Sequence, residues 1–130
     1  MDQAPLVIDE IIAGKEFVKR LNSYQPVKAA YWLRDAEGGE RYLFVALDGL
    51  TTENSDVAYR EVLRITNEMK DHYIDPFRVK LVNPDERVAR AVQDIYHRFP
   101  GRKPPSTAGP VLGGTAVADV YIYPPLEPQP

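Results

Sequence analysis

Apolar residues recur along this chain with two different spacings, and each spacing predicts one kind of secondary structure. A spacing of three to four residues, the period of an amphipathic helix, appears in residues 9–23, 56–72 and 83–99. Alternation at every second residue, or a short apolar run between turn residues, appears in residues 27–34, 41–48, 77–82 and 115–123. The pattern therefore predicts three helices and four strands in the order α-β-β-α-β-α-β.

Capping and turn residues support these boundaries. Asn54 or Ser55 is suited to cap the second helix, and Asn83 followed by Pro84 marks the start of the third. Residues 35–39, which contain two glycines, predict a hairpin between the first two strands. Apolar stripes on the three helices are expected to face the core, and they consist of Ile8, Ile11, Ile12, Val18, Leu21, then Tyr59, Val62, Leu63, Met69, then Val88, Ala91, Val92, Ile95, Tyr96 and Phe99.

We predict an α+β fold, a two-layer sandwich in which three helices lie mainly on one face of a mixed four-stranded sheet. Helices between the later strands indicate crossover connections that return to the same sheet. A chain of 130 residues is expected to form one core, so residues 1–123 make a single α+β domain and the proline-rich residues 124–130 make a tail. Residues 102–115 are rich in proline and glycine and predict a long loop.

Period two also divides the strands between two faces of the sheet. One face is almost entirely apolar and is expected to lie under the helices; it collects Val27, Ala29, Tyr31, Leu33, Leu43, Val45, Leu47, Phe77, Val79, Leu81, Ala118, Val120 and Ile122. The opposite face mixes aromatic and charged residues. We define eight of them as the candidate interaction face: Trp32, Arg34, Tyr42, Phe44, Arg78, Lys80, Tyr121 and Tyr123.

Three interpretations of the candidate interaction face stay open. A protein partner, either a second copy or another chain, would bury the aromatic centre inside a charged rim. A single-stranded nucleic acid would stack its bases on the aromatics and place phosphates near Arg78 and Lys80. In the third interpretation the loop at residues 102–115, the first helix or the tail covers the face. The net charge of −3, with Asp48 and Asp119 on this face, disfavours nucleic acid.

Composition narrows the class of protein without naming an activity. The chain holds no cysteine, which removes disulfides, thiol catalysis and cysteine-ligated metals and fits a reducing compartment. Residues 1–10 lack the basic and apolar regions of a signal peptide, and no apolar run approaches the ~20 residues that span a bilayer. We therefore expect a soluble, cytoplasmic protein with no membrane partner.

Each candidate catalytic motif in the sequence lacks the residue spacing or the predicted secondary structure that its chemistry requires. His72 and His97 lie near the ends of predicted helices, where the helix dipole favours a cation, and neither has the short spacing to carboxylates of a metal site. The glycine-rich residues 109–115 lack the lysine and the strand-to-helix context of a phosphate-binding loop. No serine lies in a GxSxG sequence. A nuclease arrangement of Asp48 with residues 68–70 would need a strand where a helix is predicted.

We assign no catalytic residue, cofactor or metal ligand from the sequence, and lean against an enzyme. The leading hypothesis is a non-catalytic protein-interaction or accessory module that forms homo-oligomers through the candidate interaction face. A nucleic-acid-binding or nucleic-acid-processing domain is the alternative, for which the basic residues 97–103 offer a phosphate contact. A small-molecule enzyme comes third. Under the leading hypothesis, replacing Trp32 with serine or lysine converts a dimer to a monomer with little loss of helix.

Overall fold

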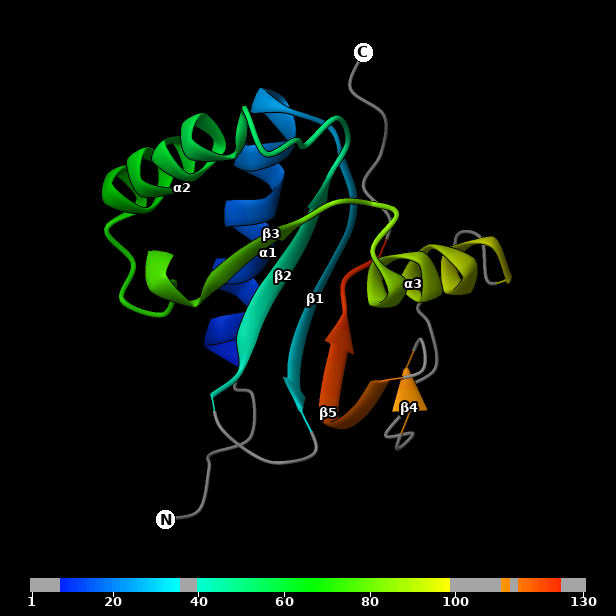
Figure 1. Ribbon diagram of the computed structural model, residues 1–130. Helices are drawn as coiled ribbons and strands as arrows, with labels where there is room; N and C mark the ends of the chain where they lie inside the picture. Colours follow the sequence, from blue (N-terminus) through cyan, green and yellow to red (C-terminus); the bar gives the residue numbers. More distant parts are fainter. Residues whose placement is uncertain (1–7, 36–39, 99–110, 113–114, 125–130) are drawn as a thin grey trace.

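The computed structural model describes residues 8–35, 40–98, 111–112 and 115–124. Figure 1 traces their elements in chain order: α1 (Ile8–Tyr24), β1 (Val27–Asp35), β2 (Tyr42–Leu47), α2 (Ser55–Met69), the 3-10 turn η1 (Pro76–Arg78), β3 (Val79–Val82), α3 (Arg87–Arg98), β4 (Val111–Leu112) and β5 (Thr115–Ile122). The predicted α+β class and the order α-β-β-α-β-α-β are confirmed for the helices and the four longer strands. The two-residue β4 falls within the predicted loop; the rest of that loop up to residue 114, and residues 125–130, lie outside the described residues.

β1 lies inside the sheet, whose strand order is β3-β2-β1-β5-β4. It pairs antiparallel with β2 and with β5, whereas β3 runs parallel to β2 after the α2 crossover, so the sheet is mixed as predicted. The register places Trp32 of β1 opposite Leu43 of β2 and Tyr121 of β5. Because residues directly opposite each other on neighbouring strands share a face, these three side chains lie in one row.

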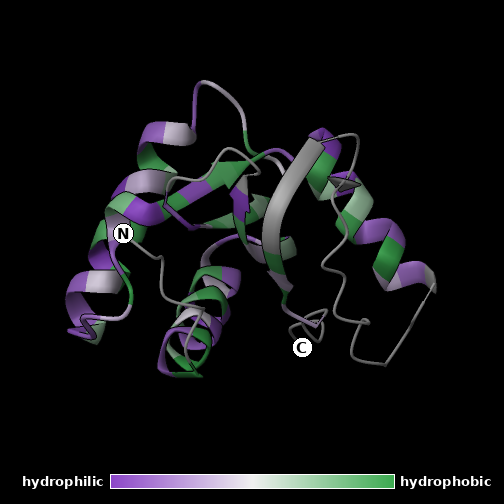
Figure 2. Cartoon of the chain, turned by 90° about the horizontal axis from the view of Figure 1, so that it is seen from below, coloured by the Kyte–Doolittle hydropathy of each residue, from purple (hydrophilic) through white to green (hydrophobic). Residues whose placement is uncertain are grey.

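Helices pack on both faces of the sheet. Two of the three, α1 and α2, share one face, and α3 lies on the other with the strands between it and α1 (Figures 1 and 2). The core under α1 and α2 is the larger: Ala13, Phe17, Val18, Leu21, Ala30, Trp32, Leu43, Val45, Leu47, Ala58, Val62, Ile65, Ile74, Val79, Leu81 and Tyr123. The core under α3 is smaller: Ala29, Tyr31, Leu33, Ala46, Val88, Ala89, Val92 and Ile122.

The face of α1 that meets the sheet differs from the predicted stripe. Ile8 and Ile12 are 73% and 60% exposed, whereas Ala13, Gly14 and Phe17 are buried. The physical reason is close approach, because a Cβ at position 14 would overlap the Tyr123 hydroxyl oxygen and lie 3.1 Å from Trp32 Nε1. The two small residues, Ala13 and Gly14, bring the helix down onto the strands and turn the isoleucines outward.

Tyr59 and Phe77, at the β3 edge of the sheet, were predicted to lie in the core, and both lie outside it. The hydroxyl of Tyr59 on α2 accepts the Leu81 N–H at 2.9 Å, so an outward donor of this edge strand is satisfied within the chain. Phe77 is 83% exposed. It belongs to η1 rather than to the strand, because Asp75 accepts the Phe77 N–H and caps a 3-10 turn that breaks the period of two.

The start of α3 is capped one turn later than the sequence predicts. Asn83 Oδ1 accepts the Asp85 N–H and so stabilises the turn before the helix. The Glu86 carboxylate accepts the N–H groups of Val88 and Ala89, both at 3.1 Å, and this interaction caps the helix itself. No helix in the described part of the chain is long and apolar enough to cross a bilayer.

Candidate functional site

The structure separates the eight residues of the candidate interaction face. Trp32 and Tyr123 are only 2% and 3% exposed and lie in the core under α1, and Tyr121 packs against the same core. The prediction that all eight share an open face is therefore wrong. Both faces of β1 are apolar, so alternation along the strand cannot tell which face the helices α1 and α2 cover.

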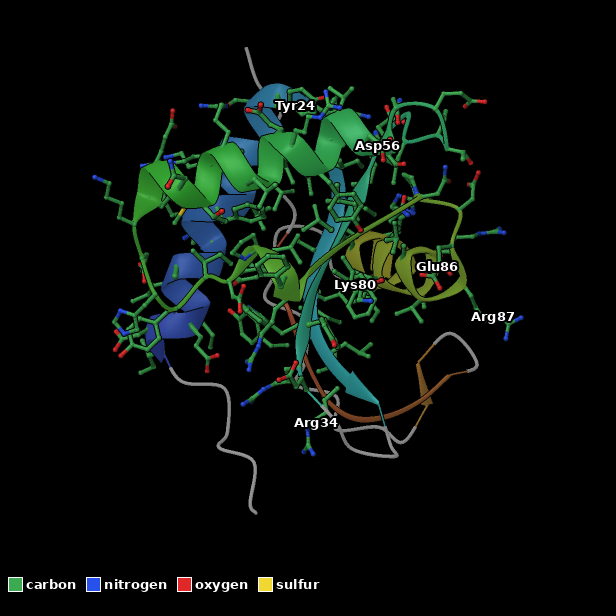
Figure 3. All side chains as sticks on the ribbon, turned by 60° about the vertical axis from the view of Figure 1, so that its left-hand side comes forward. Tyr24, Arg34, Asp56, Lys80, Glu86 and Arg87 are labelled. Atoms are coloured by element: carbon green, nitrogen blue, oxygen red, sulfur yellow. The ribbon has the colours of Figure 1, made fainter. Side chains whose placement is uncertain are left out.

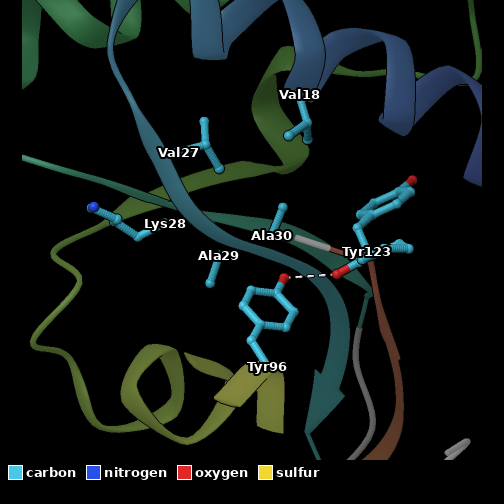
Figure 4. Close-up of a pocket in the computed structure, with 8 residues that line it drawn as sticks. Val18, Val27, Lys28, Ala29, Ala30, Tyr96 and Tyr123 are labelled. Carbon is cyan, nitrogen blue, oxygen red and sulfur yellow. Dashed lines mark hydrogen bonds between the residues drawn. The ribbon is translucent and has the colours of Figure 1, made fainter. Parts of the chain in front are cut away.

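A chain of hydrogen bonds holds the buried members in place. Trp32 Nε1 donates to the Tyr123 hydroxyl at 2.9 Å, and that hydroxyl donates to the carbonyl of Ile11 in α1 at 2.7 Å. On the other side of the sheet, the Tyr96 hydroxyl of α3 donates to the Tyr123 carbonyl at 2.7 Å, beside a small pocket (Figure 4). The Tyr123 and Tyr96 phenols thus each donate to a main-chain carbonyl and tie α1 and α3 to the end of β5.

Burial raises the pKa of three of the eight tyrosines. For Tyr31 burial is the main cause, and the nearby Glu86 and Tyr96 raise its pKa further. For Tyr96 burial raises the pKa to about 12. For Tyr123 burial outweighs the hydrogen bond from Trp32, which acts in the opposite direction. A phenolate at any of these positions would lose its hydration without gaining a cation.

These shifts predict a loss of stability in alkali. An unfolded tyrosine ionises near pH 10 while the buried phenols stay neutral, so the stability they contribute is complete below about pH 10 and falls as the pH rises towards their folded-state pKa values. The expected slope is up to ~1.4 kcal/mol per pH unit for each of the three. Urea unfolding between about pH 8 and 11, with phenolate absorbance followed in parallel, measures this; a midpoint that stays constant would contradict it.

Three residues of the candidate interaction face lie together on the side of the sheet that carries α3, and Arg78 of η1 directly precedes β3; we call these four the polar–aromatic patch: Tyr42, Phe44, Arg78 and Lys80. Phe44 pairs in register with Lys80, and the Lys80 ammonium lies 4.8 Å from the centre of the Tyr42 ring. Lys80 is exposed, and the other three are partly exposed. The β2–β3 pairing and the Lys80–Tyr42 contact thus bring Tyr42, Phe44 and Lys80 together, and that they form a binding site stays a prediction.

α3 covers β1 and leaves the polar–aromatic patch beside it. Val88, Ala89 and Val92 pack in the core that contains Tyr31, and the Tyr31 ring stacks on Phe44 with centroids 5.4 Å apart and planes 5° apart. Figure 3 shows Lys80 projecting from β3 on the side where Glu86 and Arg87 begin α3. An aromatic row therefore runs from beneath the helix to the open part of the sheet.

Charge on the patch is only partly compensated within the chain. Arg78 pairs with Glu40 at 3.3 Å, a half-exposed ion pair at the end of the patch. Lys80 contacts the Tyr42 ring and has no ion pair with a carboxylate among the described residues. Arg34 projects from the end of β1, away from Lys80, and is not part of the patch (Figure 3). The patch thus offers one cation to a carboxylate from outside.

The remaining surface shows no competing site within the described residues. A shallow hollow at the carboxyl ends of β2 and β3 is lined by Leu50, Thr51, Thr52, Glu53, Ser55 and Asn83. Three of its polar side chains bond to its own backbone: Thr51 Oγ1 accepts the Asn54 N–H, Ser55 donates to the Thr52 carbonyl and Asn83 donates to the Leu50 carbonyl. The described residues hold no cluster of three side chains suited to a metal ion. His72 lies against Tyr73, and residues 109–115 fall mostly outside the described part.

Comparison of the chain with protein-family models, with curated proteins and with solved structures finds no match.

Proposed function

We propose that this protein is a non-catalytic interaction module that binds a partner protein through the polar–aromatic patch. The partner presents a carboxylate to Lys80 and an apolar side chain to the exposed part of Phe44. We include a reducing, cytoplasmic location in this proposal because the chain holds no cysteine.

One observation carries the proposal. Lys80 is an exposed cation held over the ring of Tyr42 and next to the half-exposed ring of Phe44, and it has no carboxylate partner among the described residues. Aromatic side chains are enriched at protein interfaces, and a cation such as Lys80 suits the polar rim around them. An acidic group arriving at Lys80 gains a charge pair without having to displace an internal one.

Photo-crosslinking in cells tests which class of molecule occupies the patch. An aromatic photoreactive amino acid in place of Tyr42 leaves the Lys80 charge intact and is expected to capture a protein, and the same substitution at Tyr73, in the turn after α2, is expected to capture none. A nuclease-sensitive product, a product of twice the chain mass, or no product at Tyr42 would each overturn the proposal, in favour of a nucleic acid, of a second copy, or of an unused surface.

Binding of the captured partner, once purified, is expected to depend on charge at Lys80. Lys80→Glu should weaken the dissociation constant about tenfold or more, since it sets two like charges opposite each other. Lys28→Glu on β1 makes the same change of charge away from the patch and should leave affinity within about twofold, after allowance for long-range screening. Titration by calorimetry measures both, and equal losses in the two variants would contradict a site at Lys80.

A further inference from the structure

We infer that α3 is a displaceable cover that regulates this same surface, so that its departure extends the polar–aromatic patch onto Tyr31 of β1. The inference rests on the proposed function for its biological meaning. The displacement itself is a property of the chain alone and is tested without the partner.

The attachment of α3 to the sheet is slight. It contributes Val88, Ala89 and Val92 to the smaller core, with Ile95 and Tyr96 packed at the margin. Among the described residues, Tyr96 is the one side chain of α3 that hydrogen-bonds towards the sheet: its hydroxyl donates to the Tyr123 carbonyl, just after β5, and also interacts with the backbone of Ala30. The described residues contain no ion pair between α3 and the sheet. Helices held by few buried contacts open below the free energy of global unfolding.

A buried hydroxyl opposes the docked position of α3. Tyr31 is fully buried, and its hydroxyl has no hydrogen-bond partner among the described residues. Closing α3 over β1 therefore removes water from a polar group without replacing its hydrogen bond, which is a cost specific to the closed state. When α3 leaves, water or a partner's acceptor atom satisfies the Tyr31 hydroxyl.

Displacement would also enlarge the binding surface in a defined direction. The Tyr31 ring is stacked nearly parallel on Phe44, so the uncovered ring continues the aromatic row already present in the patch. A partner seated there would contact Tyr31, Phe44 and Lys80 and would need an acceptor for the phenol. The geometry points to a partner segment that replaces the apolar side of α3 and adds the hydrogen bond that α3 lacks.

Hydrogen exchange of the full chain, followed by mass spectrometry, tests whether α3 opens. Two variants that each lose one hydroxyl group are expected to change the exchange rate of α3 in opposite directions. Amides in the second half of α3 are expected to exchange faster than those of α1. Tyr31→Phe removes the buried hydroxyl and should slow exchange in α3 about fivefold or more. Tyr96→Phe removes the hydroxyl that donates to the Tyr123 carbonyl and should speed exchange in α3 by a similar factor.

Two results would overturn the inference that α3 is a displaceable cover. Exchange of α3 at the same rate as α1 would mean that the helix opens only in global unfolding. Faster exchange that does not respond to Tyr31→Phe would mean that the helix end frays without uncovering Tyr31. Neither result bears on Lys80→Glu, whose effect on partner binding tests the proposed function separately.

Discussion

Replacing Gly14 with alanine is expected to destabilise this protein by about 2–4 kcal/mol, although alanine is the better helix former. At an exposed helical position the same change would stabilise by about 1 kcal/mol. Here the new methyl group overlaps the Tyr123 hydroxyl oxygen and comes within 3.1 Å of Trp32 Nε1. Either α1 moves away from the sheet or the buried hydrogen bonds of Tyr123 are lost. Urea unfolding monitored by circular dichroism measures the difference.

A second substitution shows whether the hydroxyl causes the effect. Tyr123→Phe removes the oxygen that the methyl group meets, at the cost of the hydrogen bonds to Trp32 and Ile11. In that background Gly14→Ala should cost clearly less than in the wild type, giving a favourable coupling of about 1 kcal/mol or more in a double-mutant cycle. Additive losses, or a stabilising Gly14→Ala, would show that α1 does not approach the sheet this closely.

Replacing Trp32 with alanine is expected to cost about 3–5 kcal/mol of stability, the range for removing a large aromatic side chain from a core. Trp32 is 2% exposed, and its indole N–H donates to Tyr123 inside the core. This expectation reverses the prediction made from the sequence, in which Trp32 lay on an open face and could be changed to serine or lysine with little loss of helix. Chemical denaturation gives the value.

Phe77 provides the matched control for that experiment. It was predicted in the core and is 83% exposed, so Phe77→Ala should change stability by less than about 0.5 kcal/mol. If Trp32→Ala were as mild as Phe77→Ala, the register that faces Trp32 towards α1 would be wrong. The two aromatic residues thus test both errors in assigning the faces of the sheet.

The secondary structure was readable from the sequence because local chemistry decides it. The helical period around Val88 and Val92 and the hairpin between β1 and β2 depend on residues close together in the chain. The faces of β1 were not readable in the same way. Ala29, Ala30, Tyr31 and Trp32 form a continuous apolar run, and such a run is typical of a strand buried on both sides. That signal was present, and it argues for helices on both faces.

The candidate site was recoverable only in part for the same reason. Lys80 lies on β3, whose sequence alternates between apolar and charged residues, and the structure brings Tyr42 and Phe44 of β2 beside it. Trp32 was assigned to that face on β1, where alternation carries no information about burial, and Tyr123 by alternation along residues 115–123. Their polar atoms bond to each other and to α1, which no spacing in the sequence indicates. Contacts between segments that are far apart in the sequence, rather than composition, decide which aromatic residues are exposed.

The position of Tyr123 has a consequence for the order in which the chain folds. Its N–H donates to Ala30 of β1, its hydroxyl to Ile11 of α1, and its carbonyl accepts from Tyr96 of α3. The contact with Ile11 spans 112 positions, so loop closure over most of the sequence precedes it. During synthesis α1 and the β1–β2 hairpin emerge long before the residue that fastens them. We therefore expect the hydrogen bonds that join α1 and α3 to Tyr123 to form together, in one late step of folding.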